Sequence, residues 1–390
     1  MASVRIILFG ATGYTGRLTA EAMVRAGLAP VLAGRRHDAV ARLADRLAPL
    51  APSPAMQPTI AVADVTDRSS VRRLIEDSSD VIVSTVGPFV EWGDPAVEAA
   101  IDAGAAYLDS TGEPPFIRRI FDDFGPRAET TGARLITAFG YDYVPGNLAG
   151  ALALRRCERS GHPATKLDIG YFVEGTFGIS SGTRASAAGV LLAPSFARHS
   201  GVIVDRQSTR GRTRAFDLGR GRVWKGMPVA GSEHLALPLT EPGLTDIEVW
   251  LGWAGSWTPV ASYAGTVLGA IAAIPGVGTG VMGGVRRRLS RTTGQGPDAE
   301  ARAGARTVVQ AEAGDAVGRT LATIRLEGPS PYDLTAELLA WGAAMAATRP
   351  VTPGAHGPVD AFGLDALERE SNQDTLDNIL NSIRSNSATL

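Results

Sequence analysis

A glycine-rich segment near the start of the chain has the residue types that bind a pyrophosphate. The segment GATGYTG, from Gly10 to Gly16, follows a short apolar run and precedes a helical pattern. Glycines at this spacing allow a tight turn and let backbone N–H groups approach phosphate oxygens at the start of a helix. The spacing predicts a dinucleotide site whose contacts come from Gly10, Thr12, Gly13, Tyr14, Thr15 and Gly16.

Two arginines follow the second apolar run, at the position where such sites contact the adenosine ribose. Arg35 and Arg36 come directly after Gly34, and no acidic residue stands at this strand end. An acidic side chain would accept from a ribose 2′-OH, whereas arginine pairs with a 2′-phosphate. The pattern favours NADP(H) over NAD(H). The alternative interpretation is a pair of solvated arginines at the start of a helix.

Two further strand ends should lie on the cofactor side of the same sheet. Asp64 ends the third apolar run and suits either an adenine contact or the cap of the next helix. The fourth run ends in a glycine-proline turn, which approaches the ribose or nicotinamide without side-chain obstruction or is simply a tight turn. The residues of this turn are Thr85, Val86, Gly87 and Pro88.

Candidates for proton transfer follow the sixth and fifth runs. Tyr141 and Asp142 are the catalytic candidates, because a phenol or carboxyl group at this edge can donate a proton to a substrate. The alternative is a turn closed by Asp142, with Tyr141 packed between domains. Asp109 and Glu113 suit substrate orientation or capping of the following helix. The segment 180–183 suits carbonyl binding or, more simply, an N-cap.

Several other chemistries lack their residue patterns in this chain. No tyrosine has a lysine four residues later, which excludes the mechanism of short-chain dehydrogenases. No H-E-x-x-H cluster occurs and the five histidines are scattered, so no metal is predicted. No G-x-S-x-G motif marks a nucleophile elbow. Hydride transfer remains the chemistry that the sequence favours.

The first part of the chain alternates apolar strand patterns with helical ones. This rhythm predicts an α/β fold in which a doubly wound parallel sheet forms an N-terminal Rossmann domain over residues 1–147. The expected strands are 4–10, 30–34, 59–64, 80–87, 106–111 and 133–139. The expected helices are 14–26, 38–47, 69–77, 95–103 and 116–130.

The pattern changes after residue 147. Segments 166–175, 245–253 and 319–328 alternate apolar and polar residues, as antiparallel strands with one covered face do. We expect a second α+β domain over residues 148–369, with helices at 183–199 and 333–347 packed against its sheet. A polar tail, 370–390, follows and is assigned no function.

Charge and cysteine content restrict the partners and the compartment. The 390 residues carry a formal net charge of −2, which gives no bulk electrostatic reason to bind nucleic acid or an anionic membrane. A single cysteine, Cys157, forms no internal disulfide, so a reducing compartment and hence the cytoplasm is expected. The first ten residues resemble a buried strand rather than a signal peptide.

One long segment has no charged residue. From Val249 to Val285 there is no Asp, Glu, Lys or Arg, and three arginines follow at 286–288. Prolines and glycines interrupt the segment, which argues against a transmembrane helix. A buried core, a substrate tunnel, or peripheral membrane or lipid contact through 249–288 remain open.

The motifs GATGYTG, LAGRR, STVGPF, YLDSTGE, AFGYDYVPGN and SSGTRAS together resemble saccharopine dehydrogenase-like oxidoreductases, most closely the trans-acting enoyl reductases. The resemblance extends to about residue 369. It implies a Rossmann domain joined to an α+β domain, NADPH as hydride donor, and reduction of a carrier-bound polyketide double bond. The family often has Phe-Asp-Ser-x-Pro where this chain has Tyr141-Asp142-Tyr143-Val144-Pro145, which implies a different pocket.

These observations predict an NADP(H)-dependent reductase that transfers hydride to a C=C bond of a hydrophobic, small-molecule or acyl-carrier-bound enoyl substrate. One alternative is reduction of a C=N bond, as in saccharopine formation. Another is a non-catalytic NADP(H)-binding, lipid-associated protein. We expect a homodimer formed through the second domain.

Overall fold

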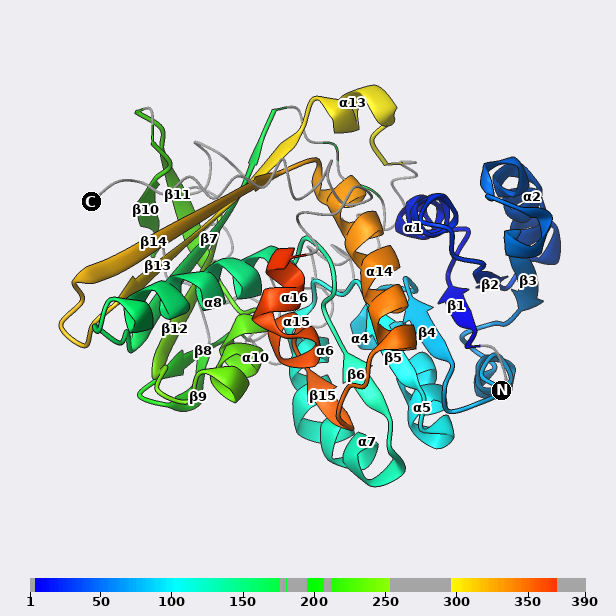
Figure 1. Cartoon of the computed structure of the whole chain (residues 1–390), viewed down its shortest axis with the longest axis horizontal. Coiled ribbons are helices and arrows are strands. Elements are labelled where there is room, and N and C mark those ends of the chain that lie inside the picture. Colours follow the sequence, from blue (N-terminus) through cyan, green and yellow to red (C-terminus); the bar gives the residue numbers. More distant parts are fainter. Residues whose placement is uncertain are drawn as a thin grey trace, which may run out of the picture. The chain divides into compact units, whose positions relative to one another are not determined.

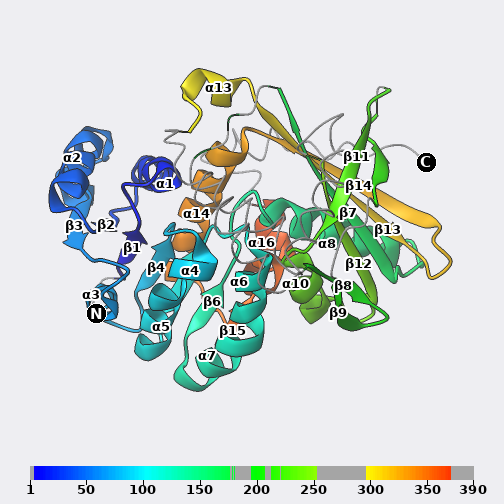
Figure 2. The same cartoon turned by 180° about the vertical axis from the view of Figure 1, so that it is seen from behind.

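The computed structural model describes residues 4–175, 178, 180, 195–206, 212–219, 221–252 and 296–369. The chain divides into two compact units. The first comprises Met1–Val144 and Tyr332–Phe362, and the second comprises Pro145–Pro331 and Gly363–Leu390. Figures 1 and 2 show the same cartoon from opposite sides. The first unit is therefore built from two separate stretches of the sequence.

The first unit contains a seven-stranded sheet in the order β15-β6-β5-β4-β1-β2-β3. Every neighbouring pair is parallel, which confirms the predicted doubly wound Rossmann sheet. The seventh strand, β15, pairs with β6 and was not predicted. The strands are β1 (Ile6–Phe9), β2 (Val31–Gly34), β3 (Thr59–Val62), β4 (Val81–Ser84), β5 (Ala106–Asp109), β6 (Arg134–Ile136) and β15 (Gly354–His356).

The helices of this unit follow the predicted alternation closely. Gly104 and Gly132 end α5 and α7 in the left-handed conformation, which glycine adopts without strain. The helix expected over 116–130 forms with a π-helical turn at Ile120–Phe124, between α6 and α7. The helices are α1 (Tyr14–Arg25), α2 (His37–Leu47), α3 (Arg68–Arg72), α4 (Phe89–Trp92), α5 (Asp94–Ala103), α6 (Pro114–Arg119), α7 (Gly125–Thr131) and α15 (Pro358–Phe362).

Helix α14 (Pro331–Thr348) packs on the first sheet, not on the second as predicted. Trp341 stacks on Phe139 with ring centroids 6.0 Å apart. A Cβ on Gly342 would lie 2.5 Å from Phe139 and 2.9 Å from Leu108, so the helix backbone lies against the sheet at this point. Figure 1 shows α14 in orange across this sheet. The apolar sequence of α14 predicts only that the helix is buried. It does not indicate which of the two sheets covers it.

The second unit contains an eight-stranded sheet with the main order β10-β11-β12-β7-β13-β14, to which β8 and β9 add through β12. The prediction of antiparallel pairing is wrong for β7 and β12, which are parallel. The long segment between these two strands supplies the crossover that parallel pairing requires. The strands are β7 (Lys166–Glu174), β8 (Ser195–His199), β9 (Val202–Arg206), β10 (Arg214–Asp217), β11 (Val223–Val229), β12 (Asp246–Leu251), β13 (Arg306–Gly314) and β14 (Thr320–Gly328).

The helices of the second unit are α8 (Val144–Arg159, which begins at the last residue of the first unit), α10 (Glu233–Thr240), α13 (Ala299–Ala303) and α16 (Leu364–Arg369). Residues 195–199, predicted as the end of a helix, form strand β8 instead. Phe196 and Ala197 are consecutive and both buried, so the segment lacks the apolar and polar alternation that would have marked it as a strand. Residues 183–194, 253–288 and 370–390 lie outside the described residues.

Three carboxylates lie side by side on one face of the second sheet. Glu248, Asp168 and Glu312 are register partners across β12, β7 and β13. Arg214 pairs with Asp168 at 3.0 Å and with Glu312 at 2.7 Å. The indole N–H of Trp250 also donates to Asp168 at 2.8 Å. Like charges directly opposite one another destabilise a sheet, so Arg214 compensates for this row.

Among the helices that the structure describes, none combines the length and the apolar character needed to span a bilayer.

Candidate functional site

The glycine-rich loop joins β1 to α1 and is tied to the neighbouring strand. The N–H groups of Gly10 and Ala11 donate to the carbonyl oxygen of Ala33 at 3.0 and 3.1 Å. Gly10 has a backbone φ of +90°, a conformation that residues with a side chain rarely adopt. The N–H of Gly13 donates to the Gly10 carbonyl oxygen at 2.9 Å and closes the turn.

The loop has no room for side chains at its glycines. A Cβ on Gly16 would lie 2.3 Å from the Gly10 carbonyl oxygen, and one on Gly10 would lie 2.8 Å from Thr85 Oγ1. Gly13 precedes α1 and provides no side-chain cap, so the first N–H groups of this helix face outward with no side-chain acceptor at the cap. Thr12, Gly13, Tyr14 and Thr15 are exposed or partly exposed there. This cradle fits an anionic pyrophosphate.

Arg35 and Arg36 follow β2 and are exposed. Neither guanidinium group forms a hydrogen bond or ion pair with any residue that the structure describes. Arg36 is the residue before α2 and has an extended backbone conformation. Two guanidinium groups without protein partners at this strand end fit a ligand phosphate.

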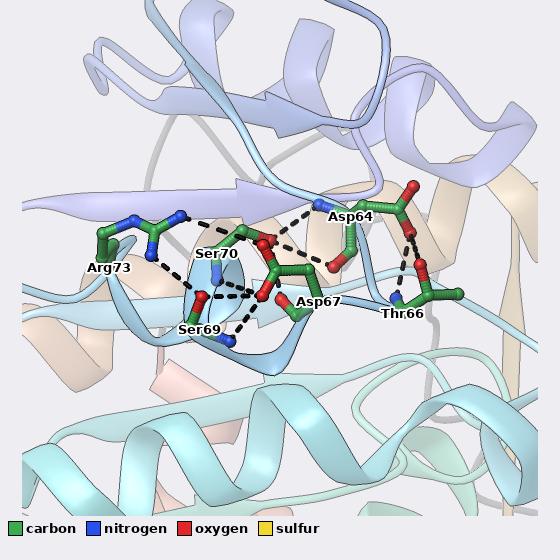
Figure 3. Close-up of polar contacts among 6 residues, drawn as sticks. All are labelled: Asp64, Thr66, Asp67, Ser69, Ser70 and Arg73. Atoms are coloured by element: carbon green, nitrogen blue, oxygen red, sulfur yellow. Dashed lines mark hydrogen bonds and ion pairs between the residues drawn. The ribbon is translucent and has the colours of Figure 1, made fainter.

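Asp64 follows β3, and its carboxylate accepts hydrogen bonds within the turn that it begins (Figure 3). Its Oδ1 accepts from the N–H of Thr66 at 2.9 Å and from Thr66 Oγ1 at 2.8 Å. These bonds, with a weaker contribution from the positive charge of Arg35, lower the pKa of Asp64. The helix cap that was one alternative for Asp64 is provided by Asp67, which accepts from the N–H groups of Ser69 and Ser70.

The turn after β4 contacts the glycine-rich loop. Thr85 Oγ1 donates to the Gly10 carbonyl oxygen at 3.2 Å, and a Cβ on Gly10 would lie 2.9 Å from Val86. The Gly87–Pro88 peptide bond is cis. The carboxylate of Glu113 accepts from the N–H groups of Phe89 and Val90, both at 2.9 Å, and so holds the residues that follow Pro88. Glu113 therefore caps α4, which precedes it in the chain.

Asp109 is fully buried and joins β5 to the loop after β6. Its Oδ1 accepts from the N–H groups of Thr111 and Ala138, both at 2.9 Å, and its Oδ2 accepts from Thr137 Oγ1 at 2.8 Å. Burial raises the pKa of Asp109 to about 6, against the lowering effect of these hydrogen bonds. Asp109 is therefore a buried residue whose hydrogen bonds hold the loops after β5 and β6, and its carboxyl group is not exposed to a ligand.

Asp142 lies in the loop after β6, beside the loop after β5. Its Oδ2 is 3.2 Å from the position that a Cβ on Gly112 would take. The residue is partly exposed, and its carboxyl group makes no hydrogen bond or ion pair with any described residue. Burial raises the pKa of Asp142 to about 7. Such a carboxyl group is partly protonated near neutral pH.

Tyr141 differs from its neighbour in exposure. The residue is 1% exposed, and its N–H donates to Thr335 Oγ1 of α14 at 3.0 Å. Thr335 was missed by the sequence analysis, because it lies almost two hundred residues further along the chain and no local motif marks it. Ser180 is buried, while 181–183 lie outside the described residues. In the part of the chain that the structure describes, no group of three or more His, Cys, Asp or Glu side chains suits a metal ion.

A parallel sheet with this cradle at the carboxyl end of β1 defines a dinucleotide-binding domain. Residues 6–133 match the family described as the saccharopine dehydrogenase NADP binding domain. A Mycobacterium tuberculosis protein provisionally named a trans-acting enoyl reductase is 30% identical over 406 aligned positions, which cover 93% of this chain and 94% of that protein. A trans-acting enoyl reductase of Mycobacterium ulcerans is 34% identical over 158 positions, covering 40% of this chain and 37% of that protein.

The chain belongs to the saccharopine dehydrogenase-like family and is an NADP-dependent oxidoreductase. A solved structure of saccharopine dehydrogenase (L-Glu forming) from Saccharomyces cerevisiae has the same fold, with a TM-score of 0.60 and 12% identity over 95% of this chain and 97% of that one. The predictions of the family, the fold class and the cofactor are confirmed.

Proposed function

We propose that this oxidoreductase reduces the C=C bond of an α,β-unsaturated thioester, with NADPH as hydride donor and Asp142 as proton donor. The observation that carries the proposal is the environment of Asp142, a carboxyl group without a cationic partner among the described residues. Burial raises its pKa to about 7. The relatives are named enoyl reductases, which supports reduction of a C=C bond.

The chemistry requires one hydride and one proton. Bound at the glycine-rich loop, NADPH would supply the hydride for the β-carbon of the substrate, and the electron pair of the double bond would then lie on the α-carbon as an enolate. Protonated Asp142 then gives its proton to the α-carbon, and water returns a proton to the carboxylate. The product is the saturated thioester, and a general acid whose pKa lies near the working pH is effective in this step.

Asp142 suits this role better than Tyr141, although both follow β6. Residue Tyr141 is 1% exposed, while residue Asp142 is partly exposed. A phenol also has an ordinary pKa near 10 and is a weaker acid toward an enolate at neutral pH. We therefore assign the proton to Asp142 and a packing role to Tyr141.

For the cofactor, the proposal assigns contacts to residues at the ends of four strands, β1 to β4. The glycine-rich loop would hold the pyrophosphate, and Arg35 and Arg36 would hold the 2′-phosphate. The turn of Thr85, Val86, Gly87 and Pro88 would border the nicotinamide ribose. Asp64 would stand near the adenine, with its Oδ2 accepting from no described residue.

The test is the oxidation of NADPH by N-acetylcysteamine thioesters of crotonic acid and of a long-chain α,β-unsaturated acid. We expect Asp142→Asn to lower kcat by about 100-fold, because the amide has no acidic proton, with the Kd for NADPH unchanged. In the unaltered protein kcat should fall as the pH rises through about 7, since only the protonated carboxyl donates. Asp38→Asn, an exposed carboxyl on α2, is the matched control.

Full activity of the Asp142→Asn protein would rule out this proton donor. Oxidation of NADPH by imines of amino acids but not by thioesters would assign the enzyme to C=N reduction instead. NADPH binding without turnover of either substrate class would favour the non-catalytic alternative.

A further inference from the structure

We infer that Thr335, on α14, is a positioning residue for Asp142: its hydroxyl fixes the peptide that precedes the proton donor. The inference rests on the proposed function, because it gives Thr335 a role only if Asp142 donates the proton. Thr335 belongs to the stretch Tyr332–Phe362, which returns to the first unit after the whole of the second unit.

The contact between α14 and the loop is close and directional. Thr335 Oγ1 accepts from the N–H of Tyr141 at 3.0 Å. A Cβ on Gly140 would lie 2.9 Å from the methyl group of Thr335 and 3.1 Å from its hydroxyl oxygen. The loop backbone therefore approaches this one side chain as closely as a glycine allows, immediately before Asp142.

The same loop is held from its other side by Asp109. The N–H of Ala138 donates to the Asp109 carboxylate at 2.9 Å, and the N–H of Phe139 donates to the Asp109 carbonyl oxygen at 2.7 Å. Asp109 thus fixes the start of the loop and Thr335 fixes its middle. Asp142 follows directly, with its carboxyl against Gly112.

These contacts are part of a continuous series that links the loops at the carboxyl edge of the first sheet with one another and with α14. The glycine-rich loop contacts the turn after β4 through Thr85, and Glu113 joins that turn to the loop after β5. Gly112 lies against Asp142. Tyr141 is bound to α14, which returns to the glycine-rich loop through an edge-on ring contact of Tyr332 with Tyr14 at 4.9 Å. One turn of α14 thereby contacts both the cofactor cradle and the loop of the proton donor.

The experiment compares Thr335→Val with Thr335→Ser. Valine keeps the shape but accepts no hydrogen bond, whereas serine keeps the hydroxyl. We expect Thr335→Val to lower kcat by about 10-fold and to alter the pH dependence of kcat, with the Kd for NADPH and the KM for the thioester unchanged, because misplaced catalytic groups reduce the rate of chemistry rather than binding. Thr335→Ser should restore kcat. Thr348→Val, on the exposed end of the same helix, controls for the effect of valine on α14.

Hydrogen exchange of the 138–145 segment provides a readout that needs no substrate. The Tyr141 amide should exchange faster in Thr335→Val than in the unaltered protein, Thr335→Ser or Thr348→Val. Unchanged exchange would overturn the inference whatever the turnover. Wild-type kcat and pH profile in Thr335→Val, combined with an inactive Asp142→Asn, would overturn the inference alone. An active Asp142→Asn would overturn the proposed function and this inference with it.

Discussion

The strands that lead to the candidate cofactor site and the strands of the second sheet differ in where their charged side chains lie. In the first unit, β1, β2 and β4 are apolar and fully buried, and charged residues such as Arg35 and Asp142 stand beyond the strand ends. In the second unit, Asp168, Glu248 and Glu312 lie within the strands. Arg214 bridges two of these carboxylates.

This difference distinguishes charges that we propose to contact a ligand from charges that pair within a sheet. Arg35, Arg36 and Asp142 form no ion pair with any residue in the described part of the chain, and we propose that they contact the cofactor and the substrate. Arg214 is bound to its own sheet, and removing it takes the ion pair from Asp168 and Glu312, which are partly buried. Substitutions in the first set should change binding and catalysis, and those in the second set should change stability.

The largest effect is expected at the glycine-rich loop. Gly16→Ala places a Cβ 2.3 Å from the Gly10 carbonyl oxygen and 3.0 Å from backbone atoms of Ala11, so the cradle must shift. We expect the Kd for NADPH to rise by about 100-fold, or about 3 kcal/mol, measured by titration of nicotinamide fluorescence. Gly243→Ala, where a Cβ meets nothing within 4 Å, is the control. An unchanged Kd for Gly16→Ala would contradict the cradle.

A smaller effect is expected for the pair Arg35→Ala and Arg36→Ala. Losing both guanidinium groups should reduce the preference for NADPH over NADH by about 30-fold, because only NADPH carries the 2′-phosphate. The free energy of unfolding should change by less than about 0.5 kcal/mol, since these arginines pair with no described residue. Arg42→Ala with Arg46→Ala removes the same charge from exposed positions on α2 and should leave the preference unchanged.

The smallest effect is expected at the charged row of the second sheet, and it is an effect on stability. Arg214→Met should lower the free energy of unfolding in urea by about 1–2 kcal/mol at neutral pH, with the Kd for NADPH unchanged. Burial raises the pKa of Asp168, against the lowering effect of Arg214. Without Arg214 this pKa rises further, so acidification neutralises the carboxyl and the loss of stability becomes smaller at lower pH.

Arg319→Met provides the comparison for this variant, because Arg319 is exposed and pairs with Asp315 at 3.1 Å on the surface. Such a pair contributes little, and its loss should be within about 0.5 kcal/mol. An equal loss of stability in both variants would show that the charged row has no special role.

The sequence predicted the features of this protein that depend on neighbouring residues. The strand, glycine turn and helix around Gly10 are local, and so is the placement of Arg35 at a strand end. The position of α14 depends on contacts of Trp341 and Thr335 with residues almost two hundred positions earlier, which no local pattern shows. For the same reason, the sequence did not show that β7 and β12 are parallel or that Glu113 caps a helix before it.

The return of Tyr332–Phe362 to the first unit also affects the order of events during synthesis. When the ribosome has made the first 144 residues, β6 still lacks its neighbour β15, and Phe139 lacks the covering rings of Trp341 and Phe362. At translation rates of about 5–20 residues per second, this apolar edge waits on the order of ten seconds or more for its partners. A nascent chain at this stage is a natural client for a chaperone that binds unpaired strands.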